Sequence, residues 1–255
     1  MSDNIRVAVC GYLGRMGSNV VEAVNGAQDI DYVGGADFLA EEGSSSAVCV
    51  KTVDELLATA KPHVVVDFTI PSSVFENARK ILGAGVHCVI GTTGLKQKQL
   101  DELDSLAKQN RVGVLVAPNF AVGAVLMMQF AKQAARHFQG VEIIELHHEK
   151  KLDSPSGTAL MTAGKIAETW SGSVRAEDEG QVARGENASG IQIHSVRLPG
   201  LVAHQEVLFG NPGEALTIRH DSFDRKSFMP GVLLGVRRIR EHQGLVFGLE
   251  NFLFE

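Results

Sequence analysis

Short apolar runs and helical patterns alternate along the first half of the chain. Uniformly apolar runs, typical of strands buried on both faces, cover residues 5–10, 31–36, 47–50, 64–68, 86–90 and 112–117. Apolar residues at helical spacing lie between many of them, at residues 16–24, 53–59, 73–82 and 96–109. This alternation predicts an α/β fold: a Rossmann-like, doubly wound domain with a parallel sheet covered by helices on both faces.

The pattern changes near residue 119. It predicts helices at 123–138 and 158–170, a mobile polar loop at 171–190, and strands at 141–147, 191–196, 203–209 and 215–220. A helix at 225–240 and a strand at 245–249 are expected to return to the first domain. We therefore expect a first domain at 1–118 and 226–255, and an inserted α+β domain with a mixed or antiparallel sheet at 119–225.

Charge and composition narrow the classes of function. The 255 residues have a formal net charge of −6 and no Lys/Arg-rich run, which argues against nucleic acid as a main partner. No apolar run approaches the roughly 18 residues that span a membrane, and the run at 5–10 is too short for a signal peptide. Cys10, Cys49 and Cys88 lack metal-ligand spacing and are expected as reduced core thiols. We expect a cytoplasmic protein without a membrane partner.

A glycine-rich turn follows the first predicted strand and opens the first predicted helix. It reads Gly11-Tyr12-Leu13-Gly14-Arg15-Met16-Gly17. Such a turn allows backbone N–H groups at a helix start to approach the pyrophosphate of a dinucleotide. The spacing is G-x-x-G-x-x-G rather than the commoner G-x-G-x-x-G, so a glycine-rich turn without a ligand is the alternative. The candidate cofactor residues here are Gly11, Tyr12, Leu13, Gly14, Arg15 and Met16.

Asp37 ends the second predicted strand, about 20 residues beyond the turn, where an acid that binds the adenosine ribose is expected. The next residue is Phe38 and not an arginine that could bind a 2′-phosphate, which favours NADH. Arg15 could still serve such a phosphate, so NADPH stays open.

Polar or small residues follow three further strands. Because ligands of such sheets bind beyond the carboxyl ends of the strands, we expect these segments to line one crevice that holds the cofactor. Ordinary loops are the alternative for each segment by itself. The candidate residues are Phe68, Gly91, Thr92, Thr93, Ala117, Pro118, Asn119 and Phe120.

Residues 145–158 read Glu-Leu-His-His-Glu-Lys-Lys-Leu-Asp-Ser-Pro-Ser-Gly-Thr and hold the densest set of chemical groups. A histidine suits proton donation near neutral pH, and Lys151 offers a charge to a carboxylate. Pro155 fits the first turn of a helix, so Ser156, Gly157 and Thr158 would present free N–H groups to an anion.

The two adjacent histidines impose a geometric condition. Neighbouring strand residues point to opposite faces, so His147 and His148 can both serve one site only if the strand ends near His147. Glu145 would then share a face with His147 and could orient its ring. A structural histidine is the alternative for His147 alone. No metal site is expected, because consecutive ligands project apart.

These segments together resemble the 4-hydroxy-tetrahydrodipicolinate reductase (dihydrodipicolinate reductase) family. The resemblance covers nearly the full length and is most specific in the His-His-x-x-Lys…Pro-Ser-Gly-Thr block. Its segments are residues 11–17, 67–69, 91–94, 117–120, 145–148, 151 with 153–158, and 219–222. Three positions depart from the usual family pattern: Ser154 replaces alanine, Asp37 replaces glutamate, and Phe38 replaces the arginine of some members.

The resemblance implies NADH- or NADPH-dependent reduction of 4-hydroxy-tetrahydrodipicolinate to tetrahydrodipicolinate, with loss of water, in diaminopimelate and lysine biosynthesis. It implies a homotetramer whose sheets pair through the second domain. His147 corresponds to the proton donor and Lys151 to the other catalytic residue. His148, Gly157 and Thr158 correspond to positions that bind the small dicarboxylate substrate. His194, His204 and His220 receive no role.

Two alternative functions are compatible with the same predicted fold. One is a two-domain dehydrogenase that acts on an amino acid or a semialdehyde. The other is a dinucleotide sensor without catalysis, which would give no reason for the His-His-x-x-Lys cluster.

Overall fold

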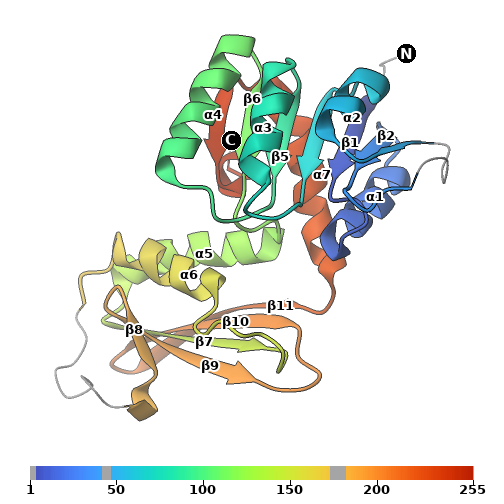
Figure 1. Cartoon of the computed structure of the whole chain (residues 1–255). Coiled ribbons are helices and arrows are strands. Elements are labelled where there is room, and N and C mark those ends of the chain that lie inside the picture. Colours follow the sequence, from blue (N-terminus) through green and yellow to red (C-terminus); the bar gives the residue numbers. More distant parts are fainter. Residues whose placement is uncertain (1–3, 42–46, 173–181, 255) are drawn as a thin grey trace. The chain divides into compact units, whose positions relative to one another are not determined.

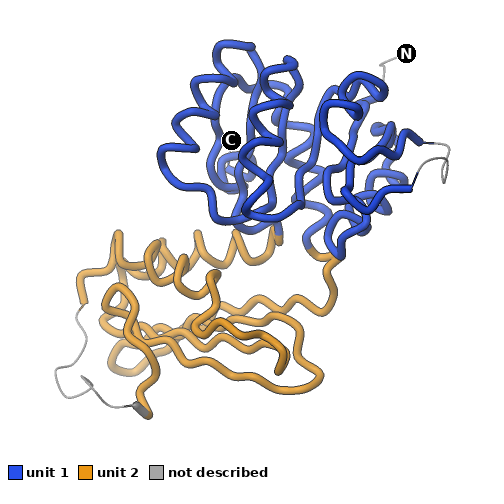
Figure 2. Tube along the Cα trace, viewed as in Figure 1, with its two compact units in different colours: residues 1–120, 228–255 blue, residues 121–227 orange. Residues whose placement is uncertain are grey.

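The computed structural model describes residues 4–41, 47–172 and 182–254. The chain divides into two compact units, which are coloured separately in Figure 2. Unit 1 comprises residues 1–120 and 228–255, and unit 2 comprises residues 121–227. Unit 2 is thus inserted into unit 1 between its sixth strand and its last helix.

Unit 1 is built on a seven-stranded sheet with the order β12-β6-β5-β4-β1-β2-β3. All of its strand pairs are parallel. Because all neighbouring strands are parallel, the carboxyl ends of the seven strands lie at one edge of the sheet (Figure 1). The strands are β1 (Ile5–Cys10), β2 (Ile30–Ala36), β3 (Val48–Val50), β4 (Val64–Asp67), β5 (His87–Ile90), β6 (Gly113–Val116) and β12 (Gly244–Phe247).

Helices cover both faces of this sheet. On one face, α2 (Val53–Ala60), α3 (Val74–Gly83) and α4 (Gln97–Asn110) bury their apolar sides in a cluster that includes Ala8 and Cys10 of β1. Val7 and Val9 alternate with those residues and are fully buried, so they face the other side. There α1 (Arg15–Gly26) contacts β1 and β2, and α7 (Met229–Arg238) contacts β5 and α1.

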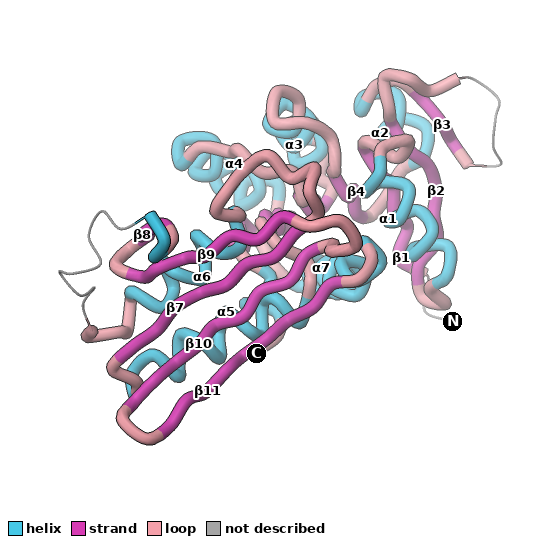
Figure 3. The backbone as a smooth tube through the Cα atoms, turned by 90° about the horizontal axis from the view of Figure 1, so that it is seen from below, coloured by secondary structure: helices cyan, strands magenta, loops and turns pink. Residues whose placement is uncertain are grey.

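Unit 2 contains a five-stranded mixed sheet with the order β11-β10-β7-β9-β8 (Figure 3). β7 and β9 are parallel, and the other neighbours are antiparallel. α5 (Val122–Ala134) and α6 (Gly157–Ala167) pack together on one face of the sheet (Figures 1 and 3). The strands are β7 (Gly140–His147), β8 (Glu186–Ala188), β9 (Ile191–Arg197), β10 (Ala203–Asn211) and β11 (Glu214–Ser222).

Three expectations need correction. α6 begins at Gly157, next to the expected start at residue 158, but Pro155 lies before the helix and not in its first turn, because the Ser156 hydroxyl accepts the Ala159 N–H and makes Ser156 the N-cap. The expected loop at 171–190 contains a 3-10 helix (Val182–Arg184) and strand β8; residues 173–181 lie outside the described residues. The expected helix at 225–240 is α7 flanked by two 3-10 helices, Arg225–Phe228 and Ile239–Glu241.

Candidate active site

The glycine turn of unit 1 joins β1 to the start of α1. Gly11 has a φ of 78°, and a Cβ there would lie 2.8 Å from the Phe68 carbonyl oxygen. A Cβ on Gly17 would lie 2.0 Å from the Gly11 oxygen. Gly14 is the N-cap of α1 and supplies no side-chain cap. Glycines therefore bring the turn close to β4 and leave the first N–H groups of α1 for an anion, which fits the pyrophosphate of a dinucleotide.

Asp37 follows β2 at the carboxyl edge of the sheet. Its carboxylate accepts the Leu13 N–H at 3.3 Å and the Leu39 N–H at 3.1 Å. The side chain thus ties the glycine turn to the end of β2 and keeps lone pairs for further donors. A pocket of about 450 Å³ extends from Gly11 and Gly14 past Asp37, Phe38 and Phe68. The same pocket is lined by residues that were not predicted: Cys10, Ala36, Lys51, Thr52, Val53, Thr69, Ile70, Ser73, Asn77 and Lys80.

Asp67 ends β4 and is fully buried. Its carboxylate accepts hydrogen bonds from the Thr69 hydroxyl at 2.6 Å, the Thr69 N–H at 2.9 Å and the Asn77 amide at 2.9 Å. The Thr92 hydroxyl lies 3.5 Å away. Burial raises the pKa of Asp67, and these hydrogen bonds oppose the rise. The network holds the loops after β4 and β5 together, a role that the sequence pattern did not reveal.

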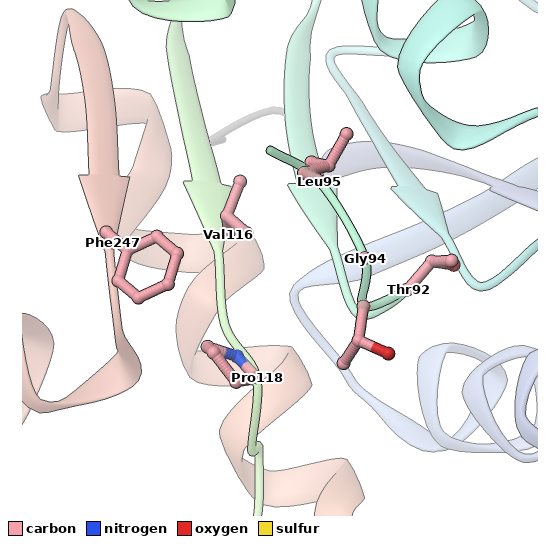
Figure 4. Close-up of a pocket in the computed structure, with 7 residues that line it drawn as sticks. Thr92, Gly94, Leu95, Val116, Pro118 and Phe247 are labelled. Atoms are coloured by element: carbon pink, nitrogen blue, oxygen red, sulfur yellow. The ribbon is translucent and has the colours of Figure 1, made fainter. Parts of the chain in front are cut away.

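A smaller pocket of about 110 Å³ lies at the ends of β5, β6 and β12 (Figure 4). Thr92, Thr93 and Pro118 of the predicted set line it, together with Gly94, Leu95, Val116 and Phe247. Phe247 ends β12 and its side chain lies beside Val116 and Pro118 (Figure 4). Phe247 was missed because it lies 129 residues beyond Pro118 in the sequence and becomes its neighbour only through the β12–β6 pairing.

The other candidate cofactor residues surround these two pockets without lining them. Gly91 packs under Phe68, because a Cβ there would lie 2.1 Å from the Phe68 ring. The rings of Phe68 and Phe120 are 5.8 Å apart. Tyr12 is half-buried beside Cys49, and its partial burial together with a hydrogen bond to Cys49 raises its pKa to about 12. Leu13 and Arg15 are exposed; Met16 and Asn119 are half-buried; Ala117 is buried.

In unit 2, Glu145 is the centre of an ionic network and is fully buried. Its Oε2 atom lies 2.5 Å from His147 Nδ1, and Arg197 binds both carboxylate oxygens at 2.7 and 2.8 Å. Burial alone would raise the pKa of Glu145, but hydrogen bonds from His147, Arg197 and Ser195 outweigh burial and lower the pKa to about 2. Glu145 is therefore a carboxylate, and His147 donates its Nδ1–H to it.

Arg197 was not predicted from the sequence. It lies 52 residues beyond Glu145, and the parallel register of β7 and β9 places it beside His147. Its guanidinium also donates to the Asp153 carbonyl oxygen at 2.8 Å. Arg197 thereby connects β9 to the segment that carries Lys151.

The start of α6 differs from the expectation. The Ser156 N–H is not free, because it donates to Glu145 Oε1 at 3.2 Å, and the Ser156 hydroxyl caps the helix. Gly157 and Thr158 are the first helical residues, so their N–H groups lie at the positive end of the helix. Ser156 therefore positions the helix end, and Gly157 is exposed there.

Lys151 and His148 lie in the turn after β7. The strand ends at His147, so His148 does not follow strand geometry. The Lys151 ammonium pairs with both oxygens of Asp153 at 2.8 Å, and Lys150 beside it is exposed. Three histidines that received no role from the sequence also lie in unit 2. His194 pairs with Glu142, His204 pairs with Asp221, and the His220 ring packs against Gly123.

The described residues contain neither a metal-binding cluster nor a membrane-spanning helix. No group of three or more His, Cys, Asp or Glu side chains is arranged to hold a metal ion within residues 4–41, 47–172 and 182–254. In the same part of the chain, no helix has the length and apolar character needed to cross a membrane.

Comparison with known proteins assigns the family. Residues 5–120 match the family model described as Dihydrodipicolinate reductase, N-terminus, and residues 123–253 match Dihydrodipicolinate reductase, C-terminus. The chain belongs to this family. It is 50% identical to the 4-hydroxy-tetrahydrodipicolinate reductase of Listeria monocytogenes serotype 4b (strain F2365) over 98% of this chain and 100% of that one. Identity to the enzyme of the same name from Syntrophomonas wolfei is 46%, over 99% and 100%.

A solved structure agrees with these matches. The dipicolinate-bound dihydrodipicolinate reductase from Paenisporosarcina sp. TG-14 superposes with a TM-score of 0.89, at 44% identity, over 97% of this chain and 99% of that one. The expected fold class, reductase function and family are therefore confirmed, and the two alternative functions are not favoured. Dihydrodipicolinate reductases use NADH or NADPH, and unit 1 is the Rossmann-type domain of the family.

Proposed function

We propose that unit 1 of this reductase binds NADH or NADPH and that unit 2 binds 4-hydroxy-tetrahydrodipicolinate and protonates it during reduction. The product is tetrahydrodipicolinate, formed with loss of water, in the diaminopimelate branch of lysine biosynthesis. The dicarboxylate character of the substrate is supported by the dipicolinate ligand of the Paenisporosarcina relative. We further propose a cytoplasmic location, as expected for this biosynthetic step.

The residues of unit 1 hold and orient the cofactor. The N–H groups at the start of α1 bind the pyrophosphate, and Asp37 accepts hydrogen bonds from the adenosine ribose. Thr92, Thr93 and Pro118 line the smaller pocket, whose position at the strand ends fits the nicotinamide half. When bound, the reduced nicotinamide supplies the hydride. The protein's contribution on this side is orientation.

The residues of unit 2 bind the substrate carboxylates. Lys151, His148 and the N–H groups of Gly157 and Thr158 provide a positive site for a dianion. The Asp153 carboxylate pairs with the Lys151 ammonium. A substrate carboxylate takes the place of the Asp153 carboxylate on the Lys151 ammonium.

The proton comes from His147. Glu145 accepts the Nδ1–H of His147, which fixes the orientation of the ring and leaves Nε2 to donate to the substrate. Arg197 and Ser156 hold the Glu145 carboxylate in turn. The pair of buried Glu145 with His147, close to the N-terminus of α6, is the single observation that carries the proposal for the proton donor.

A homotetramer is proposed from the family resemblance, and one face of the unit 2 sheet supports it. α5 and α6 cover the face that buries Ile143 and Val207. Ile144, Leu146, Val196 and Leu208 alternate with the residues of that face and point to the opposite side, where they are half-buried. The same face carries the His194–Glu142 and Arg219–Glu206 ion pairs. A face that combines apolar and charged side chains in this way suits pairing with a second copy of the chain.

The decisive test replaces the proton donor. Initial rates are measured with NADH and NADPH on the product of dihydrodipicolinate synthase. His147→Gln should lower kcat by about 100-fold or more, the range expected for general acid catalysis, with unchanged affinity for NADH. His137→Gln, an exposed histidine of the same unit, is the control. Normal turnover of His147→Gln would remove His147 from the mechanism.

A further inference from the structure

The large pocket of unit 1 contains charges of both signs where the adenosine ribose is proposed to lie. Asp37 lines it from the end of β2, and Lys51 and Lys80 line it from the end of β3 and from α3. A carboxylate beside a ribose suits NADH, because it accepts hydrogen bonds from two hydroxyl groups and repels a 2′-phosphate. Ammonium groups in the same pocket have the opposite preference.

The strand register places Lys51 beside Asp37. Ala36 of β2 pairs with Val50 of β3, and the Asp37 N–H donates to the Val50 carbonyl oxygen at 3.0 Å. Asp37 directly follows Ala36, and Lys51 directly follows Val50. The ribose-binding acid and this lysine are therefore neighbours at the carboxyl edge of the sheet.

The two lysines differ in their partners. The Lys80 ammonium lies 2.5 Å from an Asp54 carboxylate oxygen and so already has an ion-pair partner. Lys51 is exposed and makes no ion pair with any described residue. A ligand phosphate can therefore bind Lys51 without first breaking an ion pair within the described part of the chain.

Arg15, which was considered from the sequence as a ligand of the 2′-phosphate, lies outside this pocket. It is the first residue of α1, is exposed, and does not line the pocket. Its place at the glycine turn relates it to the pyrophosphate, whereas Lys51 lies next to the residue that meets the ribose.

We propose that Lys51 binds the 2′-phosphate of NADPH, so that Asp37 and Lys51 together allow this reductase to use both cofactors. Asp37 serves the ribose hydroxyls of NADH, and Lys51 compensates the repulsion between Asp37 and the added phosphate. The inference rests on the proposed function only in placing a dinucleotide in unit 1. It concerns the adenosine end, which takes no part in the reduction.

The test measures nucleotide binding without substrate. Dissociation constants of adenosine 2′,5′-bisphosphate and of adenosine 5′-monophosphate are determined by calorimetry for the full-length protein. Lys51→Ala should weaken binding of the bisphosphate about tenfold, the loss expected for one charge-assisted contact. Binding of the monophosphate should change less than about twofold. The salt dependence of bisphosphate binding should also become smaller, because one ionic contact is lost.

Lys98→Ala serves as the control within unit 1, and Lys80→Ala tests the second lysine of the pocket. Lys80 lines the same pocket but is paired, and Lys98 lies on α4 away from it. Both should retain selective binding of the bisphosphate. Equal losses for both nucleotides in Lys51→Ala, no loss for either, or a larger selective loss in Lys80→Ala would each overturn the proposal. Since no reduction is measured, these results are independent of whether the proposed substrate is turned over.

Discussion

At the scale of single residues, Glu145 joins three segments that are far apart in the sequence. Its carboxylate binds His147 on its own strand, Arg197 on β9 and the Ser156 N–H at the start of α6. The carboxylate has no exposure to solvent, so its charge is balanced almost entirely by these partners. The position of His147 therefore depends on a residue that is not itself expected to touch the substrate.

The acid stability of the protein should show the effect of Glu145. The pKa of Glu145 in the folded protein, about 2, lies below its ordinary value of 4.5. The charged carboxylate therefore adds its full contribution to the free energy of unfolding above pH 4.5, and this contribution is lost as the pH falls toward 2. The difference corresponds to about 3 kcal/mol. We expect Glu145→Gln to lower the free energy of unfolding at pH 7, and the gap to wild type to narrow below pH 5.

Urea unfolding between pH 7 and pH 3 measures this gap. Glu149→Gln, an exposed neighbour, should keep the wild-type pH dependence. A gap that stays constant over this range would show that the stabilising interactions of Glu145 do not depend on its charge.

Lys151 gives a second prediction at this scale. Lys151→Ala should raise the KM for the substrate and lower kcat, because the Lys151 ammonium is proposed to bind a carboxylate in the ground state and in the transition state. A loss of tenfold or more in kcat/KM is expected from one charge-assisted contact. Steady-state rates with Lys150→Ala as the exposed control separate this effect from a general loss of positive charge. Unchanged substrate affinity in Lys151→Ala would contradict it.

At the scale of elements, the seven strands of the first sheet follow from uniform apolar runs bounded by helical patterns. These signals are local, so the α/β class and the element order were accessible from the sequence. The order and direction of the strands in the second sheet could not be predicted from the sequence, because strands in which polar and apolar residues alternate can pair in several ways. Its mixed character comes from the parallel pair β7 and β9, which joins residues about 50 positions apart.

The candidate site could likewise be predicted only in part from the sequence. Glu145, His147, Lys151 and the α6 start lie within one segment and could be found together. Arg197 and Phe247 could not, because each reaches its neighbours through a strand pairing that the local pattern does not encode. The buried role of Asp67 was also hidden. An acid at a strand end looks the same in sequence whether it faces a ligand or binds Thr69 and Asn77.

The close contact between Gly91 and Phe68 leads to a prediction about the loop after β5. The loop after β5 passes so close to Phe68 that a Cβ at Gly91 would overlap the ring at 2.1 Å. Gly91→Ala should displace Phe68 or the loop, which costs about 1–3 kcal/mol of stability, and should weaken NADH binding. Gly83→Ala is the matched control, since nothing lies within 4 Å of a Cβ there. Thermal unfolding and NADH titration compare the two variants. Equal unfolding temperatures and equal NADH affinities would contradict the prediction and show that the loop accommodates the added Cβ without loss of stability.

At the scale of the whole molecule, the face of the unit 2 sheet opposite α5 and α6 predicts assembly. Light scattering should give a mass four times that of the 27.3 kDa chain. Leu208→Asp places a charge on this face and should reduce the mass, because a buried unpaired carboxylate is costly at an interface. Phe254→Asp, at an exposed position of unit 1, should not change it. A monomer in the wild type, or a tetramer that survives Leu208→Asp, would exclude this face as the main contact.

The Glu145 network also has a consequence for the order in which activity returns during refolding. The nucleotide pockets are built from unit 1 alone, whereas the proton donor reaches its position only after β7, β9 and the start of α6 have joined around one carboxylate. β9 and β7 are brought together by a connection of more than forty residues, whose closure carries an entropic cost. A refolding chain should therefore regain the ability to bind nucleotide before it regains turnover.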